Sequence, residues 1–314
     1  MTKEELKNAV QFTIDDAKPK EIDIYALVGN IYYKLDVLAN SQTELIHLFT
    51  SGIKKSILDN DKYQIIPYST SDERKNCYYE YDIPEEPAEI QTMRAVVGAQ
   101  DVEPYRIDND GCLKDIDALY VVLSYQNEVV VLYKNLSQLD FVDVHQRFLL
   151  VKHSDHQLTK LDKDYLRISS SFQMIRTSLG TVILDITPLE KSEGFGQVIA
   201  NEVRSRINDI DSIGLIEDME VFKSYIDNLP SRKALLQLKN SQVIKKNIGA
   251  DAIINFINSH PNIKKLFTPN GDGTKLAPSS KAETKRIIKL LNDDYVISEL
   301  TQSEYETLAK DIMS

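Results

Sequence analysis

The sequence predicts an α+β protein, with β-strands concentrated in the amino-terminal and middle parts and helices in the carboxy-terminal part. Before residue 188, apolar runs rich in Val, Ile, Leu and Tyr flank turn dipeptides such as Gly29-Asn30 and Gln126-Asn127. After Pro188, apolar residues recur every three or four positions, which is the period of an amphipathic helix. A chain of 314 residues is long for a single core. We therefore expect an α+β domain over residues 1–187 and a mainly helical domain over 188–314.

In the first domain, a charged amphipathic helix opens the chain, and two β-hairpins are expected. Residues 21–28 and 31–37 form the first pair of apolar runs, and residues 118–125 and 128–134 form the second. A helix is expected over 41–58, where Ser41 and Glu44 have the spacing of a capping box. Further short strands are expected at 63–68, 147–151, 165–169 and 178–186.

An acidic stretch separates the two hairpins. Residues 76–93 contain five acidic residues and no basic one, and their core reads IPEEPAEI. Proline-rich acidic segments favour extended, solvated backbone. We expect a connector there.

The helical domain is expected to contain six amphipathic segments. Each spaces its apolar residues at three and four positions. They cover residues 188–207, 212–229, 231–239, 250–259, 280–293 and 303–313.

The sequence predicts a cytoplasmic protein. Its apolar runs are far shorter than the roughly 20 residues that a spanning helix requires, so we expect no direct membrane insertion. The first ten residues, MTKEELKNAV, lack the apolar core of a signal peptide. Two cysteines without CxxC spacing fit a reducing compartment and predict neither a disulfide framework nor a thiolate zinc cluster.

Motifs for catalysis or metal binding are weak. His153 and His156, with His145 nearby, have no predictable third ligand. The DNDG string at 108–111 lacks the downstream glutamate of a calcium loop. Asp185, followed by Glu190 and Lys191, is the nearest approach to a magnesium nuclease site. Glu190 and Lys191 are adjacent, however, and adjacent side chains of a strand point to opposite faces, so the two could not act at one site. Capping of the next helix is the simpler role for Asp185. We expect no metal, no cofactor and no catalytic residues.

Charge is distributed very unevenly along the chain. Residues 228–289 contain twelve Lys and Arg against three acidic residues, whereas the rest of the chain contains 25 basic and 45 acidic residues. The protein is thus an acidic body, with net charge −11 overall, that carries one basic segment. Such a segment is a solvated face, a face that pairs with the protein's own acidic body or with a second subunit, a docking surface for an acidic protein, or a binding face for nucleic acid.

Within the basic segment, the run SKAETKRIIKLL is the most informative. Ser280 and Glu283 have capping-box spacing, so a helix is expected to begin there. Lys281, Lys285 and Lys289 then recur every four residues and form one cationic stripe. Like charges at this spacing repel one another, so the stripe favours an anionic partner.

Duplex DNA is the anion that fits the segment best. Binders of single strands interleave cations with aromatic rings, whereas this segment offers only Phe256 and Phe267. No helix-turn-helix or zinc-finger pattern is present to read bases, so binding is expected to tolerate any sequence. The predicted phosphate contacts are Arg232, Lys233, Lys239, Lys245, Lys246, Lys264, Lys265, Lys281, Lys285, Arg286 and Lys289.

Three strings resemble the KwaB family of the bacterial Kiwa anti-phage defence system, a family described as a domain of unknown function. They are ALYVVLSYQNEVVVLYK, LRISSSFQMIRTSLGTVILDITPLEKSEGF and LLNDDYVISELTQSEYETLAK. The resemblance implies a DNA-binding effector, dimeric, that works with the membrane protein KwaA and hinders phage DNA replication and transcription. It also implies recruitment to the inner membrane through that partner.

The combined expectation is a non-catalytic anti-phage defence protein that binds duplex DNA with little sequence specificity. Two alternatives remain. A metal-dependent nuclease would need carboxylates clustered around Asp185 or residues 108–117. A scaffold would use the basic segment to dock on an acidic protein surface.

Overall fold

The computed structural model describes residues 1–70, 76–107, 111–142, 151–154, 157–160, 164–226 and 229–307. These residues form two compact units of an α+β protein. The sheet unit comprises Met1–Ile65, Asn76–Tyr81 and Glu86–Ser192. The helical unit comprises Glu193–Ser314 and two short segments from the amino-terminal part, Ile66–Lys75 and Asp82–Glu85.

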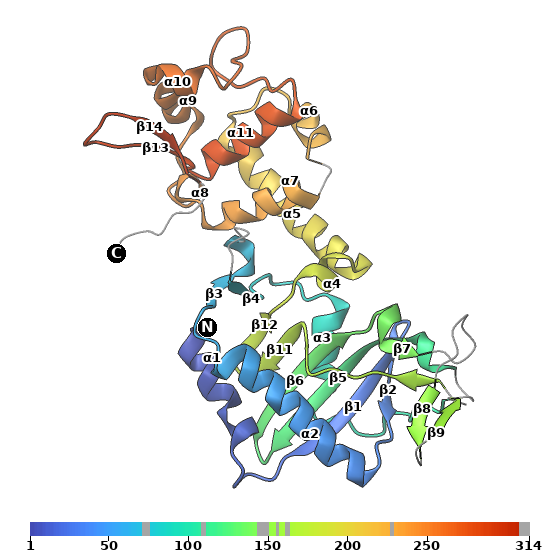
Figure 1. The fold of residues 1–314 in the computed structure, drawn as a ribbon. Helices are drawn as coiled ribbons and strands as arrows, with labels where there is room; N and C mark the ends of the chain where they lie inside the picture. Colours follow the sequence, from blue (N-terminus) through green and yellow to red (C-terminus); the bar gives the residue numbers. More distant parts are fainter. Residues whose placement is uncertain are drawn as a thin grey trace. The chain divides into compact units, whose positions relative to one another are not determined.

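The sheet unit is built on an eight-stranded sheet with the order β2-β1-β5-β6-β11-β12-β4-β3 (Figure 1). Its strands are β1 (Glu21–Val28), β2 (Ile31–Leu35), β3 (Gln64–Pro67), β4 (Cys77–Glu80), β5 (Ile116–Tyr125), β6 (Glu128–Asn135), β11 (Met174–Thr177) and β12 (Gly180–Ile183). Two-stranded ribbons pair β7 (Phe141–Val142) with β10 (Tyr165–Leu166) and β8 (Val151–Ser154) with β9 (Gln157–Lys160).

Both predicted hairpins are confirmed. In the first, Val28 pairs with Ile31 across a two-residue turn, and Gly29 has a φ of +60°, a conformation that glycine adopts without strain. In the second, β5 and β6 pair in unbroken antiparallel register from Ala118 opposite Asn135 to Tyr125 opposite Glu128. These two strands lie inside the sheet, between β1 and β11.

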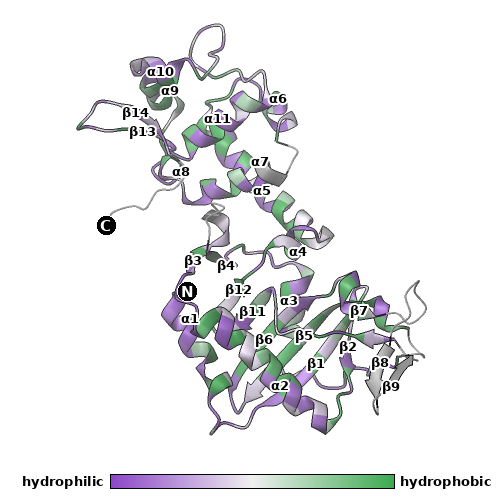
Figure 2. Cartoon of the chain, in the orientation of Figure 1, coloured by the Kyte–Doolittle hydropathy of each residue, from purple (hydrophilic) through white to green (hydrophobic). Residues whose placement is uncertain are grey.

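Helices cover the two faces of the sheet. On one face, α1 (Lys3–Val10) and α2 (Ala39–Ile53) bury Leu6, Val10, Phe49 and Ile53 against the apolar side chains of β1, β5, β6 and β11. On the other face, α3 (Ala88–Ala95) lies against β6. Figure 2 shows the hydrophobic residues concentrated along the central strands β5 and β6.

The loop before β11 is held against the sheet by a buried lysine. Lys134, at the end of β6, is 2% exposed, and its Nζ donates to Ser169 Oγ at 2.8 Å and to the Ser171 carbonyl at 3.0 Å. Helix α2 passes so close that a Cβ on Gly52 would lie 2.1 Å from the Ser170 carbonyl oxygen. A glycine is therefore required where this helix crosses the loop.

Two expectations for the sheet unit need correction. The acidic stretch 76–93 is not an extended connector, because it contains β4 and the start of α3. Helix α2 begins at Ala39 with Leu38 as its cap and continues as a short π-helix (Lys54–Leu58), so Ser41 lies inside the helix and does not cap it. The strand expected at 178–186 is confirmed as β12, which forms a hairpin with β11. The strand expected at 147–151 falls largely outside the described residues.

The helical unit contains α5 (Glu193–Ile213), α6 (Met219–Ser224), α7 (Leu229–Leu236), α8 (Gln242–Lys245), α9 (Ala250–Ser259), α10 (Pro261–Lys264) and α11 (Lys281–Leu291). The short helix α4 (Thr187–Glu190) precedes it, within the sheet unit. Helix α7 packs against both α5 and α11. The first of the two amino-terminal segments joins this core through Tyr68, whose fully buried ring meets Phe195 edge-on with centroids 5.5 Å apart.

The helix expected at 303–313 is wrong within the described residues. Residues Glu304–Glu306 form strand β14, which pairs antiparallel with β13 (Tyr295–Ile297). Val296, Ile297 and Tyr305 supply the β-branched and aromatic side chains that a small hairpin favours. Pairing with a neighbouring strand thus overrides the helical spacing of the isolated segment.

Candidate nucleic-acid interface

Helix α11 forms as the sequence predicts. The Ser280 side chain accepts a hydrogen bond from the backbone N–H of Glu283 at 3.3 Å. The Glu283 carboxylate turns instead to Ser279, whose backbone N–H it accepts at 2.7 Å. Ile287, Ile288 and Leu291 are buried, and Lys281 and Lys285 are exposed on the opposite flank. Figure 2 shows hydrophobic and hydrophilic residues in turn along this helix.

The third lysine of the predicted stripe is neutralised within the protein. Lys289 forms an ion pair with Glu306 of β14. Both side chains are partly exposed, at 33% and 45%. The stripe of free positive charge on α11 is therefore limited to its first two turns.

Arg286 and Glu283 face the segment that follows α10. Arg286 Nη1 donates to the Leu266 carbonyl at 3.3 Å, and Thr268 Oγ1 donates to Glu283 Oε1 at 2.8 Å. The hydrogen bonds from Ser279 and Thr268, together with Arg286, hold the pKa of Glu283 below its ordinary value. Glu283 is thus ionised at neutral pH and offsets the charge of Arg286 beside it.

Lys239 is also neutralised. Its Nζ donates to the Asp82 carbonyl at 2.8 Å and lies 3.2 Å from the Asp82 carboxylate. The same carboxylate accepts the backbone N–H of Ser69 at 2.8 Å, so Asp82 ties two segments of the helical unit to one lysine. Arg232 and Lys233 are half-buried on α7.

Six lysines of the predicted set are exposed. They lie at three places, which are the end of α8, the end of α10 and the outer flank of α11. They are Lys245, Lys246, Lys264, Lys265, Lys281 and Lys285. Lys245 donates to the Asn240 side chain at 3.3 Å. Among the described residues, none of the six forms an ion pair.

Helix α11 is the element that connects these three places. Its side chains at 283 and 286 bond to Thr268 and Leu266, just after α10. Its last carbonyl, that of Leu291, accepts from Ser241, which caps α8. Because residues two apart in a helix lie about 200° apart around its axis, Lys281 and Lys285 point away from Thr268. The structure therefore gathers the lysines around one helix without aligning them along one row.

The two aromatic residues of the basic segment are occupied by contacts within the unit. Phe267 is 7% exposed and meets the ring of Tyr295 edge-on, with centroids 5.9 Å apart. The half-buried ring of Phe256 lies 4.6 Å from that of His260. Both rings thus already have an aromatic neighbour within the unit, and Phe267 is too buried for a base to stack on it.

The structure also places some of the weaker candidate motifs. Asp185 accepts the backbone N–H of Thr187 at 3.0 Å just before α4, but Ile186 is the cap residue of that helix, so Asp185 does not take the capping position expected of it. Of the histidine cluster, His153 lies in β8, whereas His145 and His156 fall outside the described residues, as do residues 108–110. Within the described parts of the chain, no group of three or more His, Cys, Asp or Glu side chains is placed to hold a metal ion. No helix in those parts is long and apolar enough to cross a membrane.

The counter-ions Asp82 and Glu306 are the residues of this region that sequence reasoning missed. Both lie outside the basic segment, in stretches expected to be a connector and a helix. The only signal was the acidic surplus of the rest of the chain, which suggested internal pairing without naming a partner.

Comparisons with known proteins decide the family. The family model for Kiwa protein KwaB-like proteins matches residues 113–301, which is more than half of the chain. The chain belongs to the KwaB family. It is 24% identical to the Kiwa protein KwaB of Escherichia coli O55:H7 (strain RM12579 / EPEC), over 99% of each chain. This membership indicates a component of Kiwa anti-phage defence. No solved structure matches the chain.

Proposed function

We propose that this KwaB-family protein binds duplex DNA through exposed lysines of its helical unit, with little sequence specificity and without catalysing a reaction. In this proposal it acts in the cytoplasm with the membrane protein KwaA, is recruited to the inner membrane by that partner, functions as a homodimer and hinders phage DNA replication and transcription.

One observation carries the proposal. Lys281 and Lys285 lie one turn apart on the exposed flank of α11, and neither forms an ion pair with a described residue. Two like charges at this spacing destabilise a helix by a few tenths of a kcal/mol. Nearby acidic residues offset Lys239 and Lys289 but leave these two lysines free, as a phosphate-binding surface requires.

The electrostatics of the whole chain supports a contact with phosphates. The basic segment lies in a chain whose remaining residues are strongly acidic. Such a distribution attracts DNA to one region and repels it elsewhere, which orients the complex without reading bases. The buried ring of Phe267 and the occupied ring of Phe256 favour a duplex over a single strand.

Charge reversal on α11 tests the proposal. The Lys281→Glu/Lys285→Glu double variant should bind a fluorescein-labelled duplex at least tenfold more weakly than wild type in fluorescence anisotropy at about 100 mM salt, because two phosphate contacts are lost and two repulsions are gained. The matched control is Lys54→Glu/Lys55→Glu, which changes two adjacent exposed lysines of the sheet unit by the same total charge.

The control separates a local contact from a change in net charge. If both double variants lose affinity equally, the overall charge is responsible and the assignment to α11 fails. If the wild type does not bind the duplex at all, the exposed lysines are better explained as a docking surface for an acidic protein.

A further inference from the structure

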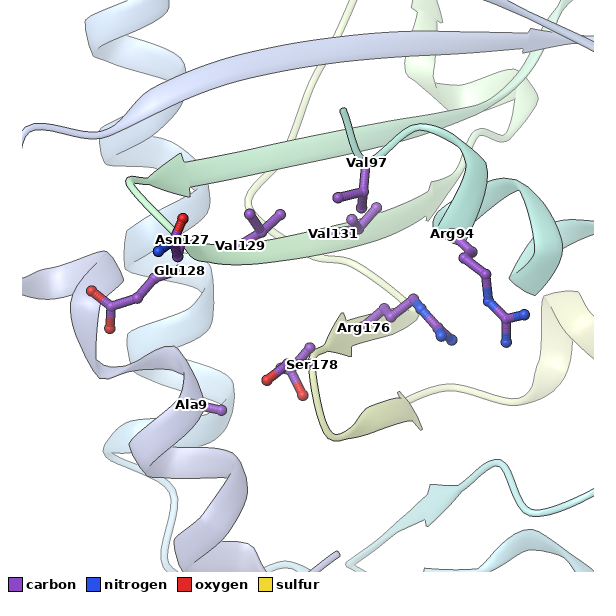
Figure 3. Close-up of a pocket in the computed structure, with 10 residues that line it drawn as sticks. Ala9, Arg94, Val97, Asn127, Glu128, Val129, Val131, Arg176 and Ser178 are labelled. Carbon is purple, nitrogen blue, oxygen red and sulfur yellow. The ribbon is translucent and has the colours of Figure 1, made fainter. Parts of the chain in front are cut away.

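A cavity of about 570 Å³ is lined by residues of the sheet unit alone. Its wall comes from α1, from β6 and the turn before it, from β11 and the turn after it, and from α3 with Val97, which lies two residues beyond the end of that helix (Figure 3). The cavity has two chemically different parts. Val97, Val129 and Val131 form an apolar side, whereas Arg94 and Arg176 form a cationic end. Its size is within the range of about 300–1,000 Å³ typical of small-molecule sites.

The two guanidinium groups converge on one carboxylate oxygen. Arg94 Nη2 lies 2.7 Å from Glu86 Oε1, and Arg176 Nη1 lies 3.6 Å from the same atom. In Figure 3 both side chains extend toward the same side of the cavity. One carboxylate neutralises only one of the two cations, so the pair keeps one positive charge. Glu86 also shows that an anionic group at this point reaches both guanidiniums.

The side chains of the two arginines differ in how firmly the protein holds them. The side chain of Arg176 is 19% exposed, and its Nη1 donates to Thr181 Oγ1 at 2.8 Å, which fixes its position. The side chain of Arg94 is 64% exposed. One guanidinium is thus preorganised, and the other has room to close over a bound group.

The other charges at the cavity do not cancel this surplus. Glu128 lies at the opposite end, and Lys18 neutralises it at 2.5 Å. In Figure 3 the Glu128 carboxylate points away from the arginines. With Glu128 paired to Lys18, the two arginines and Glu86 leave a net charge of +1, beside the exposed hydroxyl of Ser178.

Phosphate matches this arrangement better than a carboxylate. A phosphate monoester has three terminal oxygens and can accept from both guanidiniums while Glu86 keeps its own contact, and arginine forks match phosphate geometry. The apolar wall formed by the three valines favours a ligand whose phosphate is attached to an uncharged group, called here the body of the ligand. Val97 is 44% exposed although it is apolar, and such a body would cover it.

We propose that this cavity binds a small phosphorylated molecule, with Arg94 and Arg176 on the phosphate and the valine wall against the body of the ligand. This site is separate from the lysines proposed to contact DNA and does not depend on them. It gives the sheet unit a ligand-binding role of its own.

The test is a thermal-shift and calorimetric titration with two probes, inorganic phosphate and adenosine monophosphate, at about 50 mM salt to limit screening. Both should raise the melting temperature of the wild type, by about 3 °C when the probe is tenfold above its Kd. Adenosine monophosphate should bind more tightly, because only it has a body to place on the valines. Arg94→Gln should lower the affinity for both probes by about tenfold, because one charge-assisted contact to the phosphate is lost.

Arg167→Gln is the matched control. Arg167 lies in the same unit, is 65% exposed and is paired with Asp140 at 3.7 Å, but it does not line the cavity. Its loss should leave both titrations unchanged. Val97→Asp should remove the preference for adenosine monophosphate over inorganic phosphate. The proposal is overturned if neither probe binds saturably, or if Arg94→Gln and Arg167→Gln behave alike.

Discussion

Gly52→Ala tests how the core of the sheet unit is packed. In an exposed helix this change stabilises by about 1 kcal/mol, because alanine loses less backbone entropy. Here the added Cβ would lie 2.1 Å from the Ser170 carbonyl oxygen, well inside the contact distance of about 3.5 Å. Either α2 or the loop must move by more than 1 Å. The loop resists, because Lys134 holds the flanking residues Ser169 and Ser171.

The expected net effect is a loss of stability. Overpacking of a well-filled site costs about 1–3 kcal/mol, and the upper part of this range applies because the obstructing atom belongs to the backbone. Subtracting the helix gain of about 1 kcal/mol leaves a loss of about 2 kcal/mol. Gly196→Ala is the control, because its Cβ meets no atom within 4 Å and should stabilise α5 by about 0.5–1 kcal/mol.

Urea unfolding followed by circular dichroism measures both changes, and hydrogen exchange of peptides from α2 and α5 assigns each change to its unit. The two variants should shift the unfolding midpoint in opposite directions. If Gly52→Ala is as stable as the wild type or more stable, with an unchanged slope, the close contact between α2 and the loop is wrong.

Three further predictions follow from single contacts. Burial lowers the pKa of Lys134 in the folded protein. At pH values between this lowered pKa and the unfolded value of about 10.4, the unfolded chain therefore binds more protons than the folded protein does. The free energy of unfolding of the wild type should therefore rise relative to Lys134→Met as the pH increases from about 7 to 10, and a constant difference would contradict this. Phe195→Ala removes a fully buried ring and should destabilise the helical unit by about 3–5 kcal/mol, measured by hydrogen exchange of α5. Glu306→Gln releases Lys289 and should steepen the salt dependence of DNA binding by about 0.9 in log–log slope, whereas an unchanged slope would mean that Lys289 does not reach a phosphate.

Features determined by neighbouring residues were predictable from the sequence. The hairpins around Gly29 and Gln126 follow from apolar runs flanking a turn dipeptide, and both strands of each turn pair as expected. Helix α11 follows from its cap at Ser280 and its apolar period. In each case the residues that determine the element lie within the element itself.

Features that depend on distant residues were not predictable. The hairpin at 295–306 forms because β13 and β14 pair with each other, although the local spacing at 303–313 predicted a helix. Asp82 and Glu306 reach Lys239 and Lys289 across 157 and 17 positions of the chain. Charge counting identifies a basic segment, but only the folded arrangement shows which of its cations are already paired.

The same limit applies to the cavity in the sheet unit. Arg94 and Arg176 are 82 positions apart and come from a helix and a strand that no motif connects. Their convergence on Glu86 results from the order of the sheet, with α3 over β6 and β6 beside β11.

The salt dependence of duplex binding by the wild-type protein tests the central claim most directly. If the six exposed lysines all contact phosphates, the log–log slope should approach −5 and the affinity should fall on the order of a thousandfold between about 50 and 200 mM salt. Fewer contacts give a proportionally shallower slope. Absence of binding at about 50 mM salt, or an affinity that does not change across the series, would contradict the account.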